Sequence, residues 1–266
     1  MANEGEPGIS PEAKLGSAPS AAPGSGTWVI LPTFEEAENL PGIAAAVLEV
    51  LPGATLLIVD DNSPDGTGAL ADLLAASDAR VRVHHRPGKQ GLGRAYLDGF
   101  SVALAGGARH LVQMDADWSH DPKALPRLLG PIVDGWADLV IGSRYTLGGR
   151  VEDWGFGRRM VSRGGSIFAR LVLRLSPFDL TGGFKAWRAE TLAAIQFDGV
   201  HAGGYVFQIE MTHRAARSGA RIMEIPITFR DRRVGRSKMS RRIIVEALLV
   251  VVRLRAEELA SNVRNR

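Results

Sequence analysis

The chain has 266 residues, of which 45% are hydrophobic, enough to build a buried core in one large domain or two smaller ones. It contains no cysteine, which excludes a disulfide framework and a thiolate metal site. Its net charge of +3 is too small to indicate a nucleic-acid partner. These properties describe a globular protein whose ligands must be sought in its motifs.

Residues 1–26 are rich in Gly, Pro, Ala, Ser and Glu and show no apolar period, so we expect them to form a disordered leader. They also lack the basic start and apolar core of a signal peptide. The longest apolar stretch, residues 243–252, is interrupted by Glu246 and has about half the length of a bilayer span. Any membrane contact is therefore expected to be peripheral or through a partner.

Apolar strands and amphipathic helices alternate along the first half of the chain. The expected strands are residues 28–31, 55–59, 81–85, 111–114 and 139–142. The expected helices are residues 40–51, 92–105 and 124–133, with a further helix starting near Thr67. Because these strands do not alternate apolar and polar residues, they predict an α/β fold, a Rossmann-like, mostly parallel sheet with helices on both faces.

The pattern changes after Arg144. Helices are predicted over residues 158–175 and 205–218, and a half-buried strand over residues 221–229. We therefore expect one α/β domain over residues 27–239 and a C-terminal amphipathic basic helix and tail over residues 240–266.

Basic residues crowd the predicted helix over residues 158–175 and alternate there with apolar ones. This pattern favours a surface that touches an anionic, lipid-bearing partner, and a solvated face is the alternative. The arginines are Arg158, Arg159, Arg163, Arg170 and Arg174.

The most informative motif is a short apolar strand that ends in Asp115 and Asp117. Strand alternation places both carboxylates on the same side at the end of the sheet. Such a pair suits a divalent cation of the Mg²⁺ or Mn²⁺ kind that bridges to phosphate oxygens, which indicates a nucleotide-diphosphate substrate. A structural turn with a capping Asp is the alternative, but Glu36, Asp60 and Asp61 also follow predicted strands of this sheet.

Other phosphate-binding motifs fit the sequence less well. A phosphohydrolase that uses the first Asp as nucleophile needs Thr or Val two residues after the second Asp, where this chain has Ser119. The segment 88–94 does not fit a Walker loop, because Lys89 comes too early, or a dinucleotide fingerprint, because Tyr96 replaces a glycine. We interpret it as a tight loop that starts a helix.

A glycine-containing loop after the last predicted strand carries Arg232 and Lys238. Two such cations are typical of a clamp that stabilises a departing pyrophosphate beside a metal. A plain basic surface loop is the alternative interpretation.

Several of these motifs, taken together, resemble the inverting glycosyltransferases of family 2. They are residues 31–36, 59–67, 91–96, 114–120 and 142–145. Residues 181–188, 204–210 and 232–239 further resemble the dolichol- and polyprenol-phosphate mannose synthases, especially the actinobacterial ones. The resemblance covers about residues 27–250.

This resemblance implies a GT-A fold and an enzyme of the dolichyl-phosphate β-mannosyltransferase type. Its donor would be GDP-mannose, its acceptor a polyprenyl monophosphate and its cofactor Mg²⁺ or Mn²⁺. The product, formed with inversion, would serve extracytoplasmic mannosylation or glycolipid synthesis. A polyprenol-phosphate glucosyltransferase, or a relative that uses another nucleotide sugar, is the main alternative, and a non-catalytic lipid- or nucleotide-binding module is a second.

The resemblance also implies roles for individual residues. The nucleoside pocket would be lined by Pro32, Phe34, Glu36, Val59 and Asp61. The metal and sugar phosphate would lie among Asp115, Ala116 and Asp117, with Asp117 as the metal ligand, joined by Ser119 and Asp115. Phosphates would be held by Arg144, Arg232 and Lys238, and the catalytic residues would be Asp117, Arg232 and Lys238.

Two residues depart from the family pattern. Phe34 stands where Tyr is common, so stacking is kept without the hydroxyl, and Ser119 stands where some members have Gln.

The acceptor itself needs no general base, since a phosphate monoester has a second pKa of about 6 and is already anionic near neutral pH. Arg163 is the first candidate for binding the acceptor phosphate and Arg159 the second, because their basic helix should face the membrane.

The expected location is the cytoplasm, with the protein peripheral on the cytoplasmic face of the membrane. The basic amphipathic segments would dock there, either alone or with an integral membrane partner.

Overall fold

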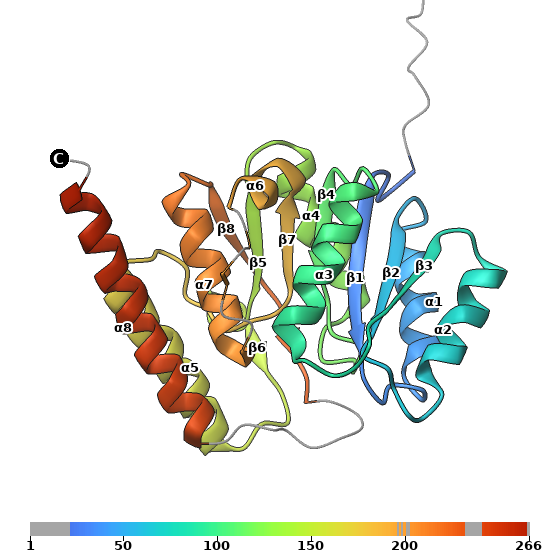
Figure 1. The fold of residues 1–266 in the computed structure, drawn as a ribbon, viewed down its shortest axis with the longest axis horizontal. Coiled ribbons are helices and arrows are strands. Elements are labelled where there is room, and N and C mark those ends of the chain that lie inside the picture. Colours follow the sequence, from blue (N-terminus) through green and yellow to red (C-terminus); the bar gives the residue numbers. More distant parts are fainter. Residues whose placement is uncertain (1–21, 196, 198, 201–202, 232–240, 265–266) are drawn as a thin grey trace, which may run out of the picture.

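The computed structural model describes residues 22–195, 197, 199–200, 203–231 and 241–264 (Figure 1). Its centre is a seven-stranded sheet with the strand order β3-β2-β1-β4-β7-β5-β8. All of these strands run parallel except β7, which is antiparallel to both of its neighbours, β4 and β5. The strands are β1 (Thr27–Thr33), β2 (Thr55–Asp60), β3 (Val81–His85), β4 (His110–Gln113), β5 (Leu139–Ser143), β7 (Lys185–Arg188) and β8 (Ile222–Pro226). The predicted α/β fold with a mostly parallel sheet is confirmed.

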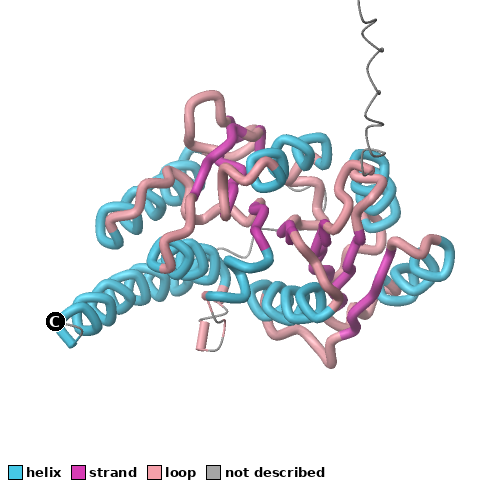
Figure 2. The backbone as a smooth tube through the Cα atoms, turned by 90° about the horizontal axis from the view of Figure 1, so that it is seen from above, coloured by secondary structure: helices cyan, strands magenta, loops and turns pink. Residues whose placement is uncertain are grey.

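Helices cover both faces of this sheet, as the continuous apolar strands require (Figure 2). One core lies between the sheet and helices α1 (Leu40–Val50), α2 (Thr67–Ser77) and α4 (Leu125–Val133), which follows the short helix η1 (Pro122–Ala124). The other core lies under α3 (Leu92–Ala105), α6 (Ala189–Ala194) and α7 (Gly204–Arg217). In α1 the buried side chains are Leu40, Ile43, Ala44, Val47 and Leu48, the spacing of one helical face.

Helices α5 (Phe156–Leu173) and α8 (Arg241–Arg264) lie side by side and form an outer layer beyond α7 (Figure 1). Their shared core includes Ala169 and Leu173 of α5, Ile209 of α7, and Val251 and Leu254 of α8. Among the described residues, no helix combines the length and the apolar character needed to cross a bilayer.

The predicted strand over residues 221–229 is divided in the structure. Its first part is β8, and its second part, β9 (Thr228–Phe229), leaves the sheet to pair in parallel with β6 (Arg150–Val151). Ile227, between β8 and β9, donates its backbone N–H to the carbonyl oxygen of Ser143. This hydrogen bond holds the small pair of strands beside the end of β5.

Some sequence predictions lie outside the described residues. Residues 1–21 of the predicted leader are among them, and so are both cations of the predicted clamp, Arg232 and Lys238. Residues 22–26 are described and form turns that lead into β1.

Candidate active site

Most of the predicted site residues lie at one edge of the sheet, where β1, β2, β4 and β5 end. The register pairs Pro32 of β1 with Val59 of β2, and Thr33 with Asp60, so these two strands end together. Beyond the ends of the four strands come Phe34 and Glu36, then Asp61, then Asp115, Ala116, Asp117 and Ser119, and finally Arg144. In open sheets of this type, ligands bind beyond the carboxyl ends of the strands.

The protein itself supplies hydrogen-bond donors to the carboxylates that end β2. Asp60 accepts bonds from the hydroxyl groups of Thr33, at 3.1 Å, and Ser63, at 2.6 Å. Arg86, whose side chain is buried, forms an ion pair with Asp61 and also donates to Asp98 at 2.7 Å. Asp60 and Asp61 are therefore stabilised by donors of the protein itself.

Asp61 and Phe34 form the predicted nucleoside side of the site. Burial raises the pKa of the Asp61 carboxyl group above its ordinary value, and the hydrogen bond from Arg86 opposes that shift. The ammonium group of Lys89 lies 3.3 Å from the centroid of the Phe34 ring, a cation–π contact. The loop that carries Lys89 is therefore in contact with the aromatic ring that should stack on the nucleobase.

Asp115 is held from two sides by residues that were not predicted as site residues. The buried hydroxyl group of Tyr96 donates to Asp115 Oδ1 at 2.8 Å. The backbone N–H of Asp115 donates to Nδ1 of His120 at 3.1 Å, and the His120 ring stacks on Phe184. Burial lowers the pKa of His120 and so favours its neutral form. Because Nδ1 accepts this hydrogen bond, the proton of the neutral ring lies on Nε2. Tyr96 ends the 91–96 motif that contributed to the resemblance, but nothing in the sequence indicated its partner.

Asp117 is buried, and its Oδ1 accepts the backbone N–H of Ser119 at 3.0 Å. Within the described part of the chain, no three His, Cys, Asp or Glu side chains are grouped closely enough to hold a metal ion by themselves. The donor set nevertheless fits Mg²⁺ or Mn²⁺, since such ions are usually bound by one or two carboxylates and completed by substrate phosphates and water. Asp115 and Asp117 would supply the carboxylates for this kind of site.

Arg144 forms a buried, bidentate ion pair with Asp179. Its Nε and Nη2 atoms each donate to the carboxylate at 2.7 Å, and Nη2 also donates to the hydroxyl group of Thr181 at 2.8 Å. Burial raises and Arg144 lowers the pKa of Asp179, with a net shift below its ordinary value. To bind phosphate as predicted, Arg144 would have to do so while it is paired with Asp179. The sequence did not indicate this ion pair.

Arg163 lies on the exposed side of α5, close enough to Tyr145, two residues beyond the end of β5, for its charge to lower the pKa of that hydroxyl group against the larger effect of burial. The buried side of the same helix is connected to the edge of the sheet through Ser162, whose hydroxyl oxygen accepts a hydrogen bond from Tyr145 at 2.7 Å, and Ser166, whose hydroxyl lies 3.3 Å from that of Thr181. Helix α5 is thereby attached to the loop that carries Arg144.

Behind the site, Lys185 in β7 is fully buried. Its ammonium group donates to the backbone oxygen of Gln208 and to the hydroxyl group of Thr212, both at 2.8 Å. Burial lowers the pKa of Lys185 from 10.5 to about 7, although the negative charge of Asp179 opposes the shift.

This shift predicts a pH dependence of stability. Between pH values of about 7 and 10, the unfolded chain binds a proton at Lys185 that the native protein lacks, so stability rises with pH by up to about 1.4 kcal/mol per pH unit. We expect the free energy of unfolding in urea to rise less steeply over this range for Lys185→Met than for the wild type. Parallel pH profiles for the two proteins would contradict the shift.

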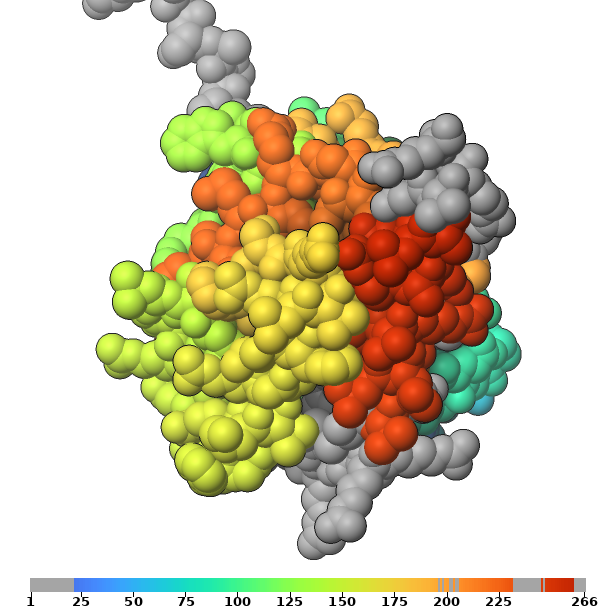
Figure 3. All heavy atoms as spheres, turned by 90° about the vertical axis from the view of Figure 1, so that its left-hand side faces the viewer, coloured from blue at the N-terminus to red at the C-terminus, as the bar shows by residue number. Residues whose placement is uncertain are grey.

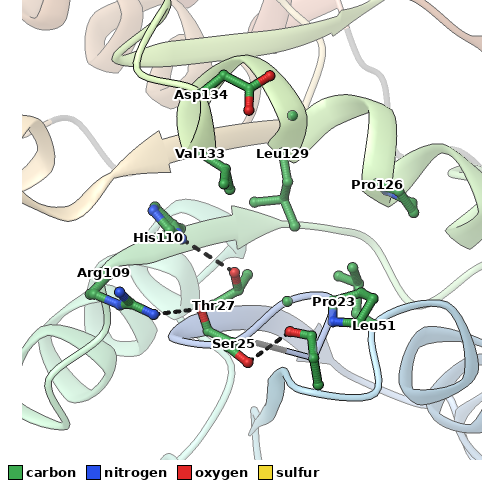
Figure 4. Close-up of a pocket in the computed structure, with 13 residues that line it drawn as sticks. Pro23, Ser25, Thr27, Leu51, Arg109, His110, Pro126, Leu129, Val133 and Asp134 are labelled. Carbon is green, nitrogen blue, oxygen red and sulfur yellow. Dashed lines mark hydrogen bonds between the residues drawn. The ribbon is translucent and has the colours of Figure 1, made fainter. Parts of the chain in front are cut away.

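A hollow of about 480 Å³ lies at the opposite end of the strands, where β1 and β4 begin (Figure 4). Its walls include Leu51, Leu129 and Val133, and its polar side chains include His110, which lies 3.5 Å from the hydroxyl group of Thr27. None of the predicted site residues lines it. The polar edge formed by the ends of β1, β2, β4 and β5 is therefore the candidate active site.

An α/β sheet with an Asp-x-Asp pair beyond a central strand is typical of glycosyltransferases of the GT-A class, and the comparison with protein families agrees. The model of the family described as glycosyl transferase family 2 matches residues 28–196. The chain belongs to glycosyl transferase family 2.

Relatives in the same family narrow the comparison. Undecaprenyl-phosphate mannosyltransferase of Micrococcus luteus is 49% identical over 224 residues, which cover 84% of this chain and 91% of that protein. Polyprenol monophosphomannose synthase of Mycolicibacterium smegmatis is 49% identical over 226 residues, or 85% of each chain. The resemblance to polyprenol-phosphate mannose synthases is confirmed.

Solved structures show the same fold at lower identity. Glucosyl-3-phosphoglycerate synthase from Mycobacterium tuberculosis, in complex with Mn²⁺, UDP and phosphoglyceric acid, matches with a TM-score of 0.63 and 20% identity over 86% of this chain and 78% of that one. Its complex with Mn²⁺, UDP-glucose and phosphoglyceric acid matches with a TM-score of 0.62 and 21% identity over 85% and 79% of the two chains. At this identity the similarity concerns the fold, and it confirms the predicted GT-A class.

Proposed function

We propose that this chain transfers mannose from GDP-mannose to a polyprenyl monophosphate with inversion at the anomeric carbon. Two relatives that are 49% identical over most of the chain are named for mannosyl transfer to lipids of this class. The observation that carries the proposal is the position of Asp115 and Asp117, both beyond β4 at the ligand-binding edge of the sheet.

A divalent cation, Mg²⁺ or Mn²⁺, is part of this proposal. Asp117 would hold it, with Ser119 and Asp115 as further ligands. When bound, such an ion neutralises the negative charge that develops on the departing nucleotide diphosphate. The fold neighbour in complex with Mn²⁺ and UDP-glucose supports a cation in this class of enzyme.

The residues of the chain would then act mainly by binding and orientation. Phe34 would stack on the base, and Asp61, fixed by Arg86, would accept hydrogen bonds from it. Arg144, Arg232 and Lys238 are proposed to hold phosphate oxygens, and the last two lie outside the described residues. A general base is not needed, because the acceptor phosphate is already anionic.

The acceptor would approach from the side of α5. Arg163 is proposed to bind its phosphate, because this arginine stands among exposed apolar residues that are spaced four or seven positions apart along α5. These residues are Phe156, Met160, Ile167 and Leu171. A basic group within an apolar stripe fits the boundary between a lipid chain and its phosphate headgroup.

The membrane surface is the proposed partner of the layer formed by α5 and α8. Figure 3 shows the two helices side by side on one face of the molecule, α5 in yellow and α8 in red. On α8, the exposed apolar side chains are Val245, Leu248, Leu249, Val252 and Leu259. Together with the arginines of α5, this face is suited to a peripheral position on the cytoplasmic leaflet, either alone or with an integral membrane partner.

This docking face can be tested with two substitutions on α5. Phe156 and Leu171 are 79% and 72% exposed, so replacing both by Glu should leave the fold intact. We expect the double variant to bind vesicles that contain anionic lipid at least about tenfold more weakly in co-sedimentation, since each inserted side chain contributes about 1.5–3 kcal/mol.

Leu73→Glu is the matched control, because Leu73 lies on α2, near the other edge of the sheet, and is 66% exposed. It should bind vesicles as the wild type does. Equal losses for the control and the double variant, or no loss for either, would contradict docking by α5.

The donor and acceptor are tested together in one assay. Purified protein is supplied with a polyprenyl monophosphate, Mg²⁺ or Mn²⁺, and radiolabelled GDP-mannose, GDP-glucose or UDP-glucose, and label is counted in the lipid phase. The proposal expects label to be transferred from GDP-mannose. Transfer from a glucose donor alone would replace it by a polyprenol-phosphate glucosyltransferase.

A further inference from the structure

Gln208 of α7 has a buried side-chain amide without hydrogen-bond partners in the part of the chain that the structure describes. The residue is 3% exposed, and neither Nε2 nor Oε1 is bonded to any described residue. Buried amides are nearly always hydrogen-bonded, so an amide with both groups unsatisfied calls for an explanation. A ligand that both donates and accepts is one such explanation.

The amide lies directly behind Gly183, in the loop before β7. A Cβ atom at Gly183 would lie 3.4 Å from Nε2 of Gln208, 3.8 Å from Oδ1 of Asp115 and 3.8 Å from Cε1 of His120. These three groups surround the position where a side chain of residue 183 would lie. Gly183 has no side chain and is partly exposed, so a space is left there, at the edge of the candidate active site. We call this space the Gly183 niche.

The groups around the Gly183 niche have complementary chemistry. The carboxylate of Asp115 is an acceptor, and its Oδ1 is already fixed by the hydroxyl group of Tyr96 at 2.8 Å. The amide of Gln208 offers both a donor and an acceptor. A sugar hydroxyl group also donates one hydrogen bond and accepts others, so it matches this pair.

The position of Gln208 is fixed by its backbone. Its carbonyl oxygen accepts hydrogen bonds from the buried ammonium group of Lys185, at 2.8 Å, and from the hydroxyl group of Thr212, at 2.9 Å. These bonds connect the first half of α7 to β7, while the side chain of Gln208 keeps its own torsions. Nε2 of that side chain already lies at the niche, 3.4 Å from the Cβ position of Gly183.

We propose that Gln208 is a specificity-determining residue whose amide, together with the Asp115 carboxylate, binds a hydroxyl group of the transferred hexose in the Gly183 niche. This inference rests on the proposed function in one respect, that the donor is a nucleotide-linked hexose. It assigns recognition of the sugar to α7, a helix that carries none of the residues proposed to bind the nucleotide or the metal.

The test compares the affinities for GDP-mannose and for GDP by isothermal titration calorimetry in the presence of Mg²⁺. Gln208→Met keeps the length of the side chain and removes both polar groups. We expect it to weaken GDP-mannose binding about tenfold, the effect of one lost hydrogen bond, while GDP binding is unchanged. A purely structural role of Gln208 would weaken the binding of both nucleotides equally, and that result would overturn the inference.

Gly183→Ala provides a second variant that retains the Gln208 amide. The added methyl group makes ordinary van der Waals contacts at 3.4 Å and 3.8 Å, so the protein should fold while the niche is filled. Its GDP-mannose affinity should fall about tenfold without a change for GDP, as for Gln208→Met. Unchanged GDP-mannose binding in this variant would also overturn the inference, even if Gln208→Met failed to fold.

Gln113→Met is the matched control. Gln113 is another buried glutamine with an unbonded Nε2, but its Oε1 accepts the indole N–H of Trp187 at 2.8 Å within the core. Gln113→Met should leave the ratio of the affinities for GDP-mannose and GDP unchanged. A change as large as that caused by Gln208→Met would contradict the proposed role of the Gly183 niche. Selective binding of GDP-mannose without any lipid product would contradict the proposed function and leave this inference standing.

Discussion

Asp117→Asn is expected to abolish measurable mannosyl transfer. The substitution preserves the shape of the side chain but removes the negative charge proposed to hold the cation beside the departing GDP. Loss of one electrostatic stabiliser of a transition state commonly lowers kcat by about 10²–10³, and loss of the cation should reach at least the upper end of that range. The measurement is kcat/KM for GDP-mannose with a polyprenyl phosphate acceptor.

Asp121→Asn is the matched control for this experiment. Asp121 lies four residues further along and is exposed, and its carboxylate accepts the backbone N–H of Lys123 at 2.9 Å as the cap of helix η1. It should retain kcat/KM near the wild-type value. Binding of Mn²⁺, followed by electron paramagnetic resonance in the presence of GDP, should be lost in Asp117→Asn alone, and retained binding would contradict the proposed metal ligand.

Asp179→Ala is expected to lower the free energy of unfolding more than any of the other substitutions proposed for this protein. The carboxylate of Asp179 is fully buried and is bonded through both oxygens to the guanidinium group of Arg144. Removal of one partner of such a pair leaves a buried charge uncompensated and costs about 3–5 kcal/mol. Urea denaturation should show this as a lower midpoint with little change in slope.

Glu257→Ala supplies the contrast for the buried pair. Glu257 accepts a hydrogen bond from Arg253 at 2.7 Å on α8, where both side chains are exposed. Exposed pairs of this kind contribute about 1 kcal/mol or less. Comparable losses for Asp179→Ala and Glu257→Ala would show that the Arg144–Asp179 pair does not stabilise the fold as a buried ion pair.

The parallel part of the sheet could be predicted from the sequence because β1, β2, β4 and β5 are built on continuous apolar runs, while β8 was predicted as a half-buried strand. Strand β7 could not be predicted in this way. It has only four residues, Lys185–Arg188, two of which are cationic, and it is inserted antiparallel between β4 and β5. Its place depends on pairing with strands that are distant in the sequence, and the buried Lys185 is stabilised by bonds to α7 that no local pattern shows.

Only those residues of the candidate site that belong to sequence motifs could be predicted. Asp115 and Asp117 were identifiable because they directly follow a short apolar run. The structure brings both to the expected edge, but β4 ends at Gln113, so they lie in the loop beyond it and strand alternation does not fix their relation. The residues that hold them were not identifiable. Tyr96 and His120 reach Asp115 only through the folded arrangement of α3 and the loop after β4, and Asp179 meets Arg144 across 35 residues of chain.

The most direct test of the proposed function is the cation dependence of lipid mannosylation by the wild-type protein. Protein freed of metal is mixed with GDP-mannose and a polyprenyl monophosphate, and the lipid product and released GDP are quantified as Mn²⁺ or Mg²⁺ is added. The account predicts no product without the cation, and equal amounts of GDP and mannosylated lipid once it is present. Product formed equally well in excess EDTA, or GDP released without mannosylated lipid, would contradict it.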